Sequence, residues 1–116
     1  MIEFEEYKGK LNGLKPTLDA LRDALHLEAA EKEIEELEGQ SARDGFWNDV
    51  ENSQRVQKRL KQLKAKVENY EKLCSGWDDL MTLCEMAIEE DDDSMLPELQ
   101  SEYAEFEKKL EETRLG

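Results

Sequence analysis

The feature that most constrains the fold is an apolar repeat in the second half of the chain. Ten apolar or aromatic residues follow one another at gaps of four and three: Val56, Leu60, Leu63, Val67, Tyr70, Cys74, Trp77, Met81, Cys84 and Ile88. A 3.5-residue repeat keeps one stripe of a helix facing a partner and is typical of left-handed coiled coils. We therefore expect one helix over residues 49–89, about 60 Å long. Ser75-Gly76 lies inside it without breaking the phase, which predicts a soft spot rather than a turn.

The same spacing recurs in three other segments. The stripes consist of Phe4, Tyr7, Leu11, Leu14, Leu18, Leu21 and Leu25, then Leu27, Ala30, Ile34 and Leu37, and finally Leu96, Leu99, Tyr103, Phe106, Leu110 and Thr113. These patterns predict helices over residues 2–25, 27–38 and 95–114. The first two helices join near His26, either as one continuous helix or through a bend.

Pro16 interrupts the first segment. A proline inside a helix removes one backbone hydrogen bond and crowds the carbonyl four residues earlier, which here belongs to Asn12. We therefore expect a kink or a restart of the helix near residues 13–16, although the apolar spacing continues across it.

Each apolar stripe is too narrow to be buried on a single helix. Long helices with short connections pack antiparallel against one another. The sequence thus predicts an all-α fold, an antiparallel coiled-coil-like bundle of three long helices plus one short helix, as a single domain over residues 1–116. An intermolecular coiled coil is the alternative, but the short acidic or glycine-containing connections favour a monomer.

Residues 39–49 break the helical pattern. Glycine, Asp and Asn dominate this stretch, and Asn48 or Asp49 is placed to cap the following helix. Phe46 and Trp47 are large and apolar, so we expect both to fold back and close the end of the bundle. The alternative is an aromatic pair offered on the surface to a partner.

An acidic run over residues 89–93 ends the longest helix. Carboxylates are favoured at the start of a helix, so Asp93 or Ser94 is expected to cap the last helix, with Pro97 in its first turn. A calcium loop of the EF-hand type needs a central glycine, which this run lacks. We interpret the run as a solvated turn.

The net charge of −14 makes the chain as a whole a poor ligand for nucleic acid. One stretch is locally basic and contains Arg55, Lys58, Arg59, Lys61, Lys64 and Lys66. We interpret it as a solvated helix face paired with glutamates and aspartates, with a binding patch as the alternative.

No catalytic, cofactor-binding or metal-binding residues are predicted. His26 is the single histidine, and no metal, phosphate-loop or Cys–His spacing is present. Cys74 and Cys84 would lie roughly 15 Å apart on one helix, too far for a disulfide. Free cysteines, together with the lack of a signal or membrane-spanning segment, lead us to expect a cytoplasmic protein without a membrane partner. Because the catalytic motifs are missing, we expect a protein that is not an enzyme and has no small-molecule substrate.

Several stretches together resemble a known family. They are residues 21–25, the Glu-rich helix that follows, Asp44-Gly45-Phe46-Trp47-Asn48-Asp49, Tyr70-Glu71-Lys72-Leu73, residues 89–93 and Glu107-Lys108-Lys109-Leu110-Glu111. In order and spacing they resemble the N-terminal helical domain of bacterial class I peptide chain release factors. The Phe46–Asp49 turn is more similar to the factor 2 branch than to the factor 1 branch.

The resemblance implies a role in translation termination as the first domain of a longer factor that acts at the stop codons UAA and UGA. In that family a Gly-Gly-Gln loop promotes hydrolysis and a Ser-Pro-Phe motif helps to read the codon. Neither is present here, and the nearest string is Glu38-Gly39-Gln40. The resemblance therefore implies docking on the ribosome near the stalk base, where the acidic surface suits basic proteins better than rRNA.

Overall fold

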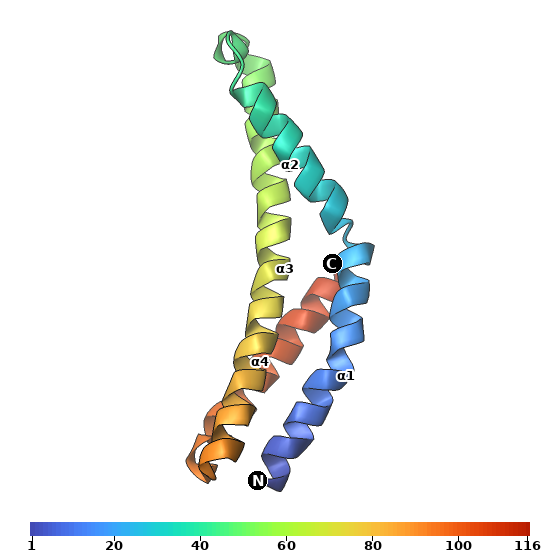
Figure 1. The fold of residues 1–116 in the computed structure, drawn as a ribbon. Coiled ribbons are helices and arrows are strands. Elements are labelled where there is room, and N and C mark those ends of the chain that lie inside the picture. Colours follow the sequence, from blue (N-terminus) through green and yellow to red (C-terminus); the bar gives the residue numbers. More distant parts are fainter. The chain divides into compact units, whose positions relative to one another are not determined.

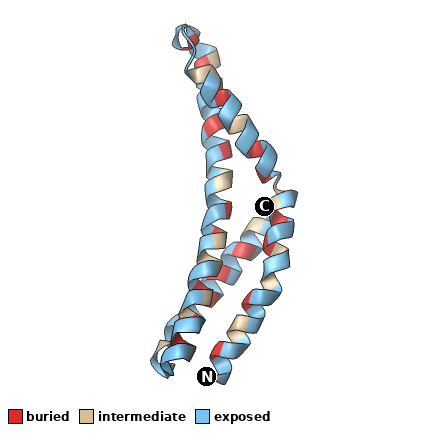
Figure 2. Ribbon diagram, in the orientation of Figure 1, coloured by how far each residue is buried: buried red, intermediate tan, exposed pale blue.

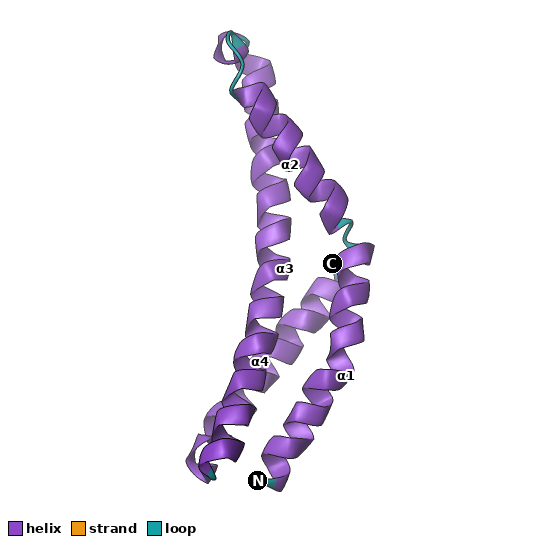
Figure 3. Ribbon diagram, in the orientation of Figure 1, coloured by secondary structure: helices purple, strands orange, loops and turns teal.

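The computed structural model describes residues 1–116 and confirms an all-α fold. Figures 1 and 3 show helices joined by short turns, with no strand. The elements in chain order are α1 (Ile2–Ala24), α2 (Leu27–Ser41), η1 (Phe46–Asn48), α3 (Val50–Glu90), η2 (Asp93–Met95) and α4 (Leu96–Leu115). Every α-helix begins and ends within three residues of the range expected from the sequence.

The chain divides into two compact units, which we call unit 1 and unit 2. Unit 1 comprises residues 1–21 and 71–116, and unit 2 comprises residues 22–70. Helices α1 and α3 contribute residues to both units, whereas α2 belongs to unit 2 and α4 to unit 1.

Unit 2 is a helical hairpin. Helix α2 and the first part of α3 run in opposite directions, connected by the turn that contains η1 (Figure 1). Its core consists of Ala30, Leu37, Phe46, Val56, Leu60 and Leu63, with Ile34 and Val67 packed against it. Apart from Phe46, which comes from η1, these residues occupy the positions that the 3–4 spacing predicts on α2 and α3.

Unit 1 packs three helical segments together. Tyr7 of α1 meets Tyr103 of α4 edge to face, with ring centroids 5.0 Å apart. Trp77 of α3 donates its indole N–H to the carbonyl oxygen of Leu11 in α1 at 2.6 Å. A Cβ placed on Gly76 of α3 would lie 3.5 Å from Cδ1 of Phe106 in α4. Each segment of unit 1 therefore contacts both of the others.

In unit 1, α3 buries a second stripe that the repeat does not predict. Leu73, Leu80 and Ala87 are buried, whereas the predicted positions Trp77 and Met81 are only half-buried. Figure 2 shows buried and intermediate positions alternating with exposed ones along α3. Because α1 and α4 pack on different sides of α3, the burial here is spread over two stripes. The prediction of one buried stripe from 56 to 88 is correct only in part beyond Tyr70, where Cys84 is fully buried and the other predicted positions are half-buried.

Helix α1 continues through Pro16, so the restart expected near residues 13–16 is wrong, whereas the alternative of a kink stays a prediction. A proline inside a helix is unfavourable by about 3 kcal/mol. Leu11 and Leu18, on either side of Pro16, are almost completely buried. Burying two leucines contributes roughly 3–6 kcal/mol, which is enough to offset the lost hydrogen bond.

The turns follow local backbone rules. Oδ1 of Asp49 accepts a hydrogen bond from the amide of Asn52 at 3.1 Å, so the expected Asp49 cap of α3 is confirmed. At the end of α3, Asp91 adopts a left-handed conformation with φ 51°, and the amide of Asp92 bonds the carbonyl of Ala87. This is a Schellman ending, with Asp91 in the position that glycine usually occupies.

The cap expected before α4 lies one residue earlier. Asp92, not Asp93 or Ser94, accepts the amide hydrogen bond, from Ser94 at 2.9 Å. It caps the short η2 turn, and α4 follows from Met95 without a side-chain cap. The position expected for Pro97 in the first turn of α4 is confirmed.

Candidate interaction surfaces

The single histidine belongs to unit 2, and both cysteines belong to unit 1. His26 is exposed in the turn between α1 and α2, with a left-handed backbone at φ 55°, and its carbonyl accepts the amide of Ala30. The two helices are therefore joined by a bend and do not form one continuous helix. Both cysteines are free, and burial raises the pKa of the Cys84 thiol. No three His, Cys, Asp or Glu residues are grouped so that they could hold a metal ion.

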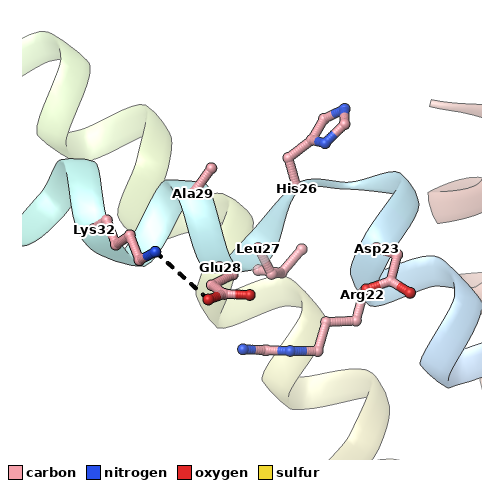
Figure 4. A pocket seen from close by; sticks show the side chains of 7 residues that line it. All are labelled: Arg22, Asp23, His26, Leu27, Glu28, Ala29 and Lys32. Carbon is pink, nitrogen blue, oxygen red and sulfur yellow. Dashed lines mark ion pairs between the residues drawn. The ribbon is translucent and has the colours of Figure 1, made fainter.

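An open depression of about 400 Å³ surrounds the bend at His26. Figure 4 shows the imidazole of His26 pointing away from Arg22, with Glu28 and Lys32 joined in an ion pair. Arg22 donates to Oε1 of Glu31 at 3.2 Å, and this hydrogen bond raises the pKa of the arginine. No nucleophile and base face each other here, so the charged groups brace the bend rather than form a reaction site.

A second depression of about 240 Å³ lies between α3 and α4 in unit 1. It is lined by three carboxylates, Asp79, Glu102 and Glu105, beside Phe106. Partial burial, followed by the charge of Glu98, raises the pKa of Glu102. A raised carboxyl pKa can mark an acid catalyst, but no histidine, cysteine or serine lines this depression. We assign it no chemistry.

Unit 2 carries opposite charges on its two helices. The guanidinium of Arg59 binds both carboxylate oxygens of Glu33, at 2.6 and 2.8 Å. This fork-shaped contact holds the pKa of Glu33 below its usual range. Lys64 reaches Glu38 at 3.4 Å. These pairs join α3 to α2 at the rim of the apolar core.

Only some cations of the basic stretch over residues 55–66 form ion pairs with α2. Arg59 and Lys64 pair with glutamates, and Arg55 donates to the side-chain oxygen of Asn52 at 2.7 Å. Lys58, Lys61 and Lys66 make no ion pair or hydrogen bond. The interpretation of the whole stretch as paired with acidic residues is therefore correct for two cations and wrong for the others.

The two aromatic residues at the end of the hairpin, Phe46 and Trp47, differ in burial. Phe46 is buried in the core of unit 2, whereas Trp47 keeps 61% of its surface exposed. Their rings meet edge to face at 4.9 Å. The prediction that both residues fold back is correct for Phe46 and wrong for Trp47, because the η1 turn directs consecutive side chains to different sides. Val50 nearby is also 60% exposed.

Glu38-Gly39-Gln40, the segment most similar to the Gly-Gly-Gln motif of release factors, lies in the last turns of α2. Residues 38–40 are helical, and a Cβ on Gly39 would meet nothing within 4 Å. A catalytic loop is therefore not formed at this place. Among the helices of the structure, none combines the length and the apolar character needed to cross a membrane.

The sequence shows where the basic residues of α3 lie, but it does not show which acidic residues they pair with. The basic stretch could be recognised by composition, whereas the choice of Glu33 as the partner of Arg59 spans 26 residues. No local spacing rule relates two residues on different helices. The exposure of Trp47 likewise depends on the η1 turn, for which the sequence showed only glycine and Asp/Asn.

The helices and surfaces described above define an all-α, strongly charged domain. Residues 30–115 match the PCRF domain family, which accounts for most of the sequence. The chain belongs to the PCRF domain family.

Similar curated proteins carry the name peptide chain release factor 2. The protein of Acidothermus cellulolyticus is 37% identical over 102 residues, which cover 88% of this chain and 28% of that protein. Those of Petrotoga mobilis and Lactiplantibacillus plantarum are 30% and 31% identical over 115 residues, or 99% of this chain. The chain spans about three-tenths of the length of these relatives. They confirm the resemblance to release factors and the similarity to the factor 2 branch.

Proposed function

We propose that this chain is the N-terminal helical domain of a peptide chain release factor and acts in translation termination. The observation that carries the proposal is the match of residues 30–115 to the PCRF domain family, with relatives named peptide chain release factor 2. The parent factor would act at UAA and UGA. Units 1 and 2 together form its first domain in this proposal.

The domain's part in termination is docking rather than chemistry. It places the factor on the ribosome near the stalk base, in the cytoplasm, without a cofactor, a small-molecule substrate or a membrane. A net charge of −14 favours basic ribosomal proteins as partners over bare rRNA. The absence of a nucleophile–base pair around either depression supports a non-enzymatic role.

A competition experiment tests the docking role with the chain as it is. Ribosomes that display a stop codon and peptidyl-tRNA are given an intact release factor 2, and the rate of peptide release is measured with increasing amounts of the chain. We expect the rate to fall, because the chain occupies the site that the factor needs. An unchanged rate at saturating chain would contradict docking.

A second measurement addresses the parent protein. The reading frame beyond codon 116 is expected to encode Gly-Gly-Gln and Ser-Pro-Phe. A stop codon at 117 would instead favour a free-standing coiled-coil adaptor or oligomerisation module. Sedimentation separates these alternatives further, because buried stripes within one chain predict a monomer at all concentrations.

A further inference from the structure

The outer side of α3 in unit 2 is strongly cationic. Residues 52–67 contain six Lys and Arg and no Asp or Glu, although the chain has 30 acidic residues. All the acidic residues and the other ten basic residues lie outside this stretch, so the remainder carries a net charge of −20. Because the positive residues are concentrated in this stretch, it forms a positive surface on an otherwise negatively charged protein.

Helical spacing defines the shape of this surface. Arg55, Lys58 and Lys61 follow one another at intervals of three residues and are all exposed. They lie on the side of α3 opposite to Val56, Leu60 and Leu63, which face the core. From Arg55 to Lys66 the surface extends for about 16 Å along the helix. We call it the cationic face.

Neutral side chains lie between the cations, and the exposed carboxylates of Glu51 and Glu68 bound the cationic face at its two ends. Gln54, Gln62 and Ala65 are exposed between the cations. Glutamine amides donate hydrogen bonds to phosphate and sugar oxygens in nucleic-acid complexes. Lys58 and Lys61 are free of any pairing within the chain, so a ligand does not need to displace an existing ion pair.

The composition of the cationic face distinguishes between two kinds of acidic partner. Protein interfaces have an apolar core in which lysine is depleted and large aromatic residues are enriched. Every exposed residue from Arg55 to Lys61 is polar, and the exposed Trp47 and Val50 lie before this face begins. Interfaces with nucleic acid are more polar and much more positive, and lysines there contact phosphates. The face therefore fits a phosphate backbone better than an acidic protein surface.

We propose that the cationic face of α3 binds the phosphate backbone of a structured RNA, through Arg55, Lys58 and Lys61. The inference deepens the proposed function, and rests on it only for the expectation that the RNA is ribosomal. Repulsion from the remaining acidic surface keeps the binding weak and local.

Binding of the chain to a labelled RNA duplex of about 20 base pairs tests the cationic face directly. Three forms are compared by fluorescence anisotropy: the unchanged chain, Arg55→Gln with Lys58→Gln and Lys61→Gln, and a control with Lys8→Gln, Lys108→Gln and Lys109→Gln. Both variants remove three positive charges. The control takes them from unit 1, so net charge is matched. Circular dichroism verifies that each form keeps its helices, and the single variant Lys58→Glu provides a milder test.

We expect the α3 variant to bind the duplex about tenfold more weakly than the unchanged chain in low salt. The slope of log affinity against log salt should fall by about two to three, since each lost phosphate contact contributes about 0.9. The control should stay within about twofold of the unchanged chain. Lys58→Glu should weaken binding in the same direction.

Three results would overturn the proposal. They are no duplex binding by the unchanged chain in low salt, equal losses in the α3 and control variants, and binding of a poly-glutamate peptide as tight as that of RNA. The last result would indicate an acidic protein partner instead. Failure of the chain to compete in the peptide-release assay would count against the proposed function alone, because duplex binding does not depend on that assay.

Discussion

Unit 1 and unit 2 use the same kind of helix but are stabilised differently. Unit 2 is a two-helix hairpin with one buried stripe and ion pairs along its rim, such as Arg59 with Glu33. Unit 1 has three helical segments, aromatic contacts and an indole hydrogen bond that crosses from α3 to α1. A third helix packed on α3 changes which residues of the apolar repeat are buried, although the repeat itself is unchanged.

The largest expected difference between the units concerns their leucines. Leu80→Ala in unit 1 and Leu63→Ala in unit 2 both remove a buried side chain. Each should lower the free energy of unfolding by about 2–5 kcal/mol. Leu80→Ala should be the more damaging, because helices on two sides of α3 leave less freedom to close the cavity.

Urea unfolding followed by circular dichroism measures both effects. A greater loss for Leu63→Ala would reverse the proposed order of the two units. A loss below about 0.5 kcal/mol at either position would show that the leucine does not belong to the core.

The next effect concerns the indole of Trp77. Trp77→Phe keeps a large apolar ring but removes the N–H that bonds the carbonyl of Leu11, and it weakens the contact with Lys15, whose Nζ lies 4.6 Å from the ring centroid. We expect a loss of about 1–2 kcal/mol in the free energy of unfolding. Trp47→Phe is the matched control, because Trp47 is exposed and should change stability by less than about 0.5 kcal/mol. Equal thermal stability of the two variants would rule out the role of the indole bond.

A smaller and opposite effect is expected from glycines inside helices. Gly76→Ala should raise the free energy of unfolding by up to about 1 kcal/mol, since alanine favours helix. The added Cβ would lie at an ordinary contact distance of 3.5 Å from Phe106. Gly39→Ala in α2 is the control without such a neighbour. If thermal unfolding shows Gly76→Ala to be destabilised while Gly39→Ala is stabilised, α3 and α4 are packed too closely for a side chain at position 76.

The smallest effect belongs to the rim of unit 2. Arg59 lowers the pKa of Glu33, so the carboxylate adds stability above its unfolded pKa. That contribution disappears as the pH falls through the lowered pKa of the folded state. Glu33→Gln should therefore be slightly less stable than the unchanged chain at neutral pH and equal to it at strongly acid pH.

Unfolding curves at several pH values and salt concentrations measure this difference. The exposed pair should also weaken as salt rises. A difference that persists unchanged at strongly acid pH would show that the effect of Glu33→Gln does not come from the ion pair.

Much of the local structure could be predicted from the sequence. The four helices, the Asp49 cap and the position of Pro97 follow from spacing and from the chemistry of helix ends. The predictions failed where a distant neighbour decides the outcome. Pro16 stays inside α1 because buried leucines on both sides support the helix. Trp47 stays exposed although its ring contacts that of Phe46, because only Phe46 enters the core of unit 2.

The basic surface of α3 could also be predicted in part from the sequence. Composition located the basic stretch, and the resemblance to release factors came from the order of short motifs, which the match to the PCRF domain family confirms. Composition could not distinguish the cations that pair with α2 from those that remain free. That distinction requires the position of Glu33 and Glu38 in space, across a turn and many residues of helix.

The helices, their approximate ends and the contrast between the Glu-rich α2 and the basic stretch of α3 could be read from the sequence, because these features depend on residues within a few turns of one another. The tertiary structure alone decided which sides of α3 are buried and which cations are left unpaired. Burial and pairing are set by the helices that pack around a residue, and the order of residues within one helix does not specify these neighbours.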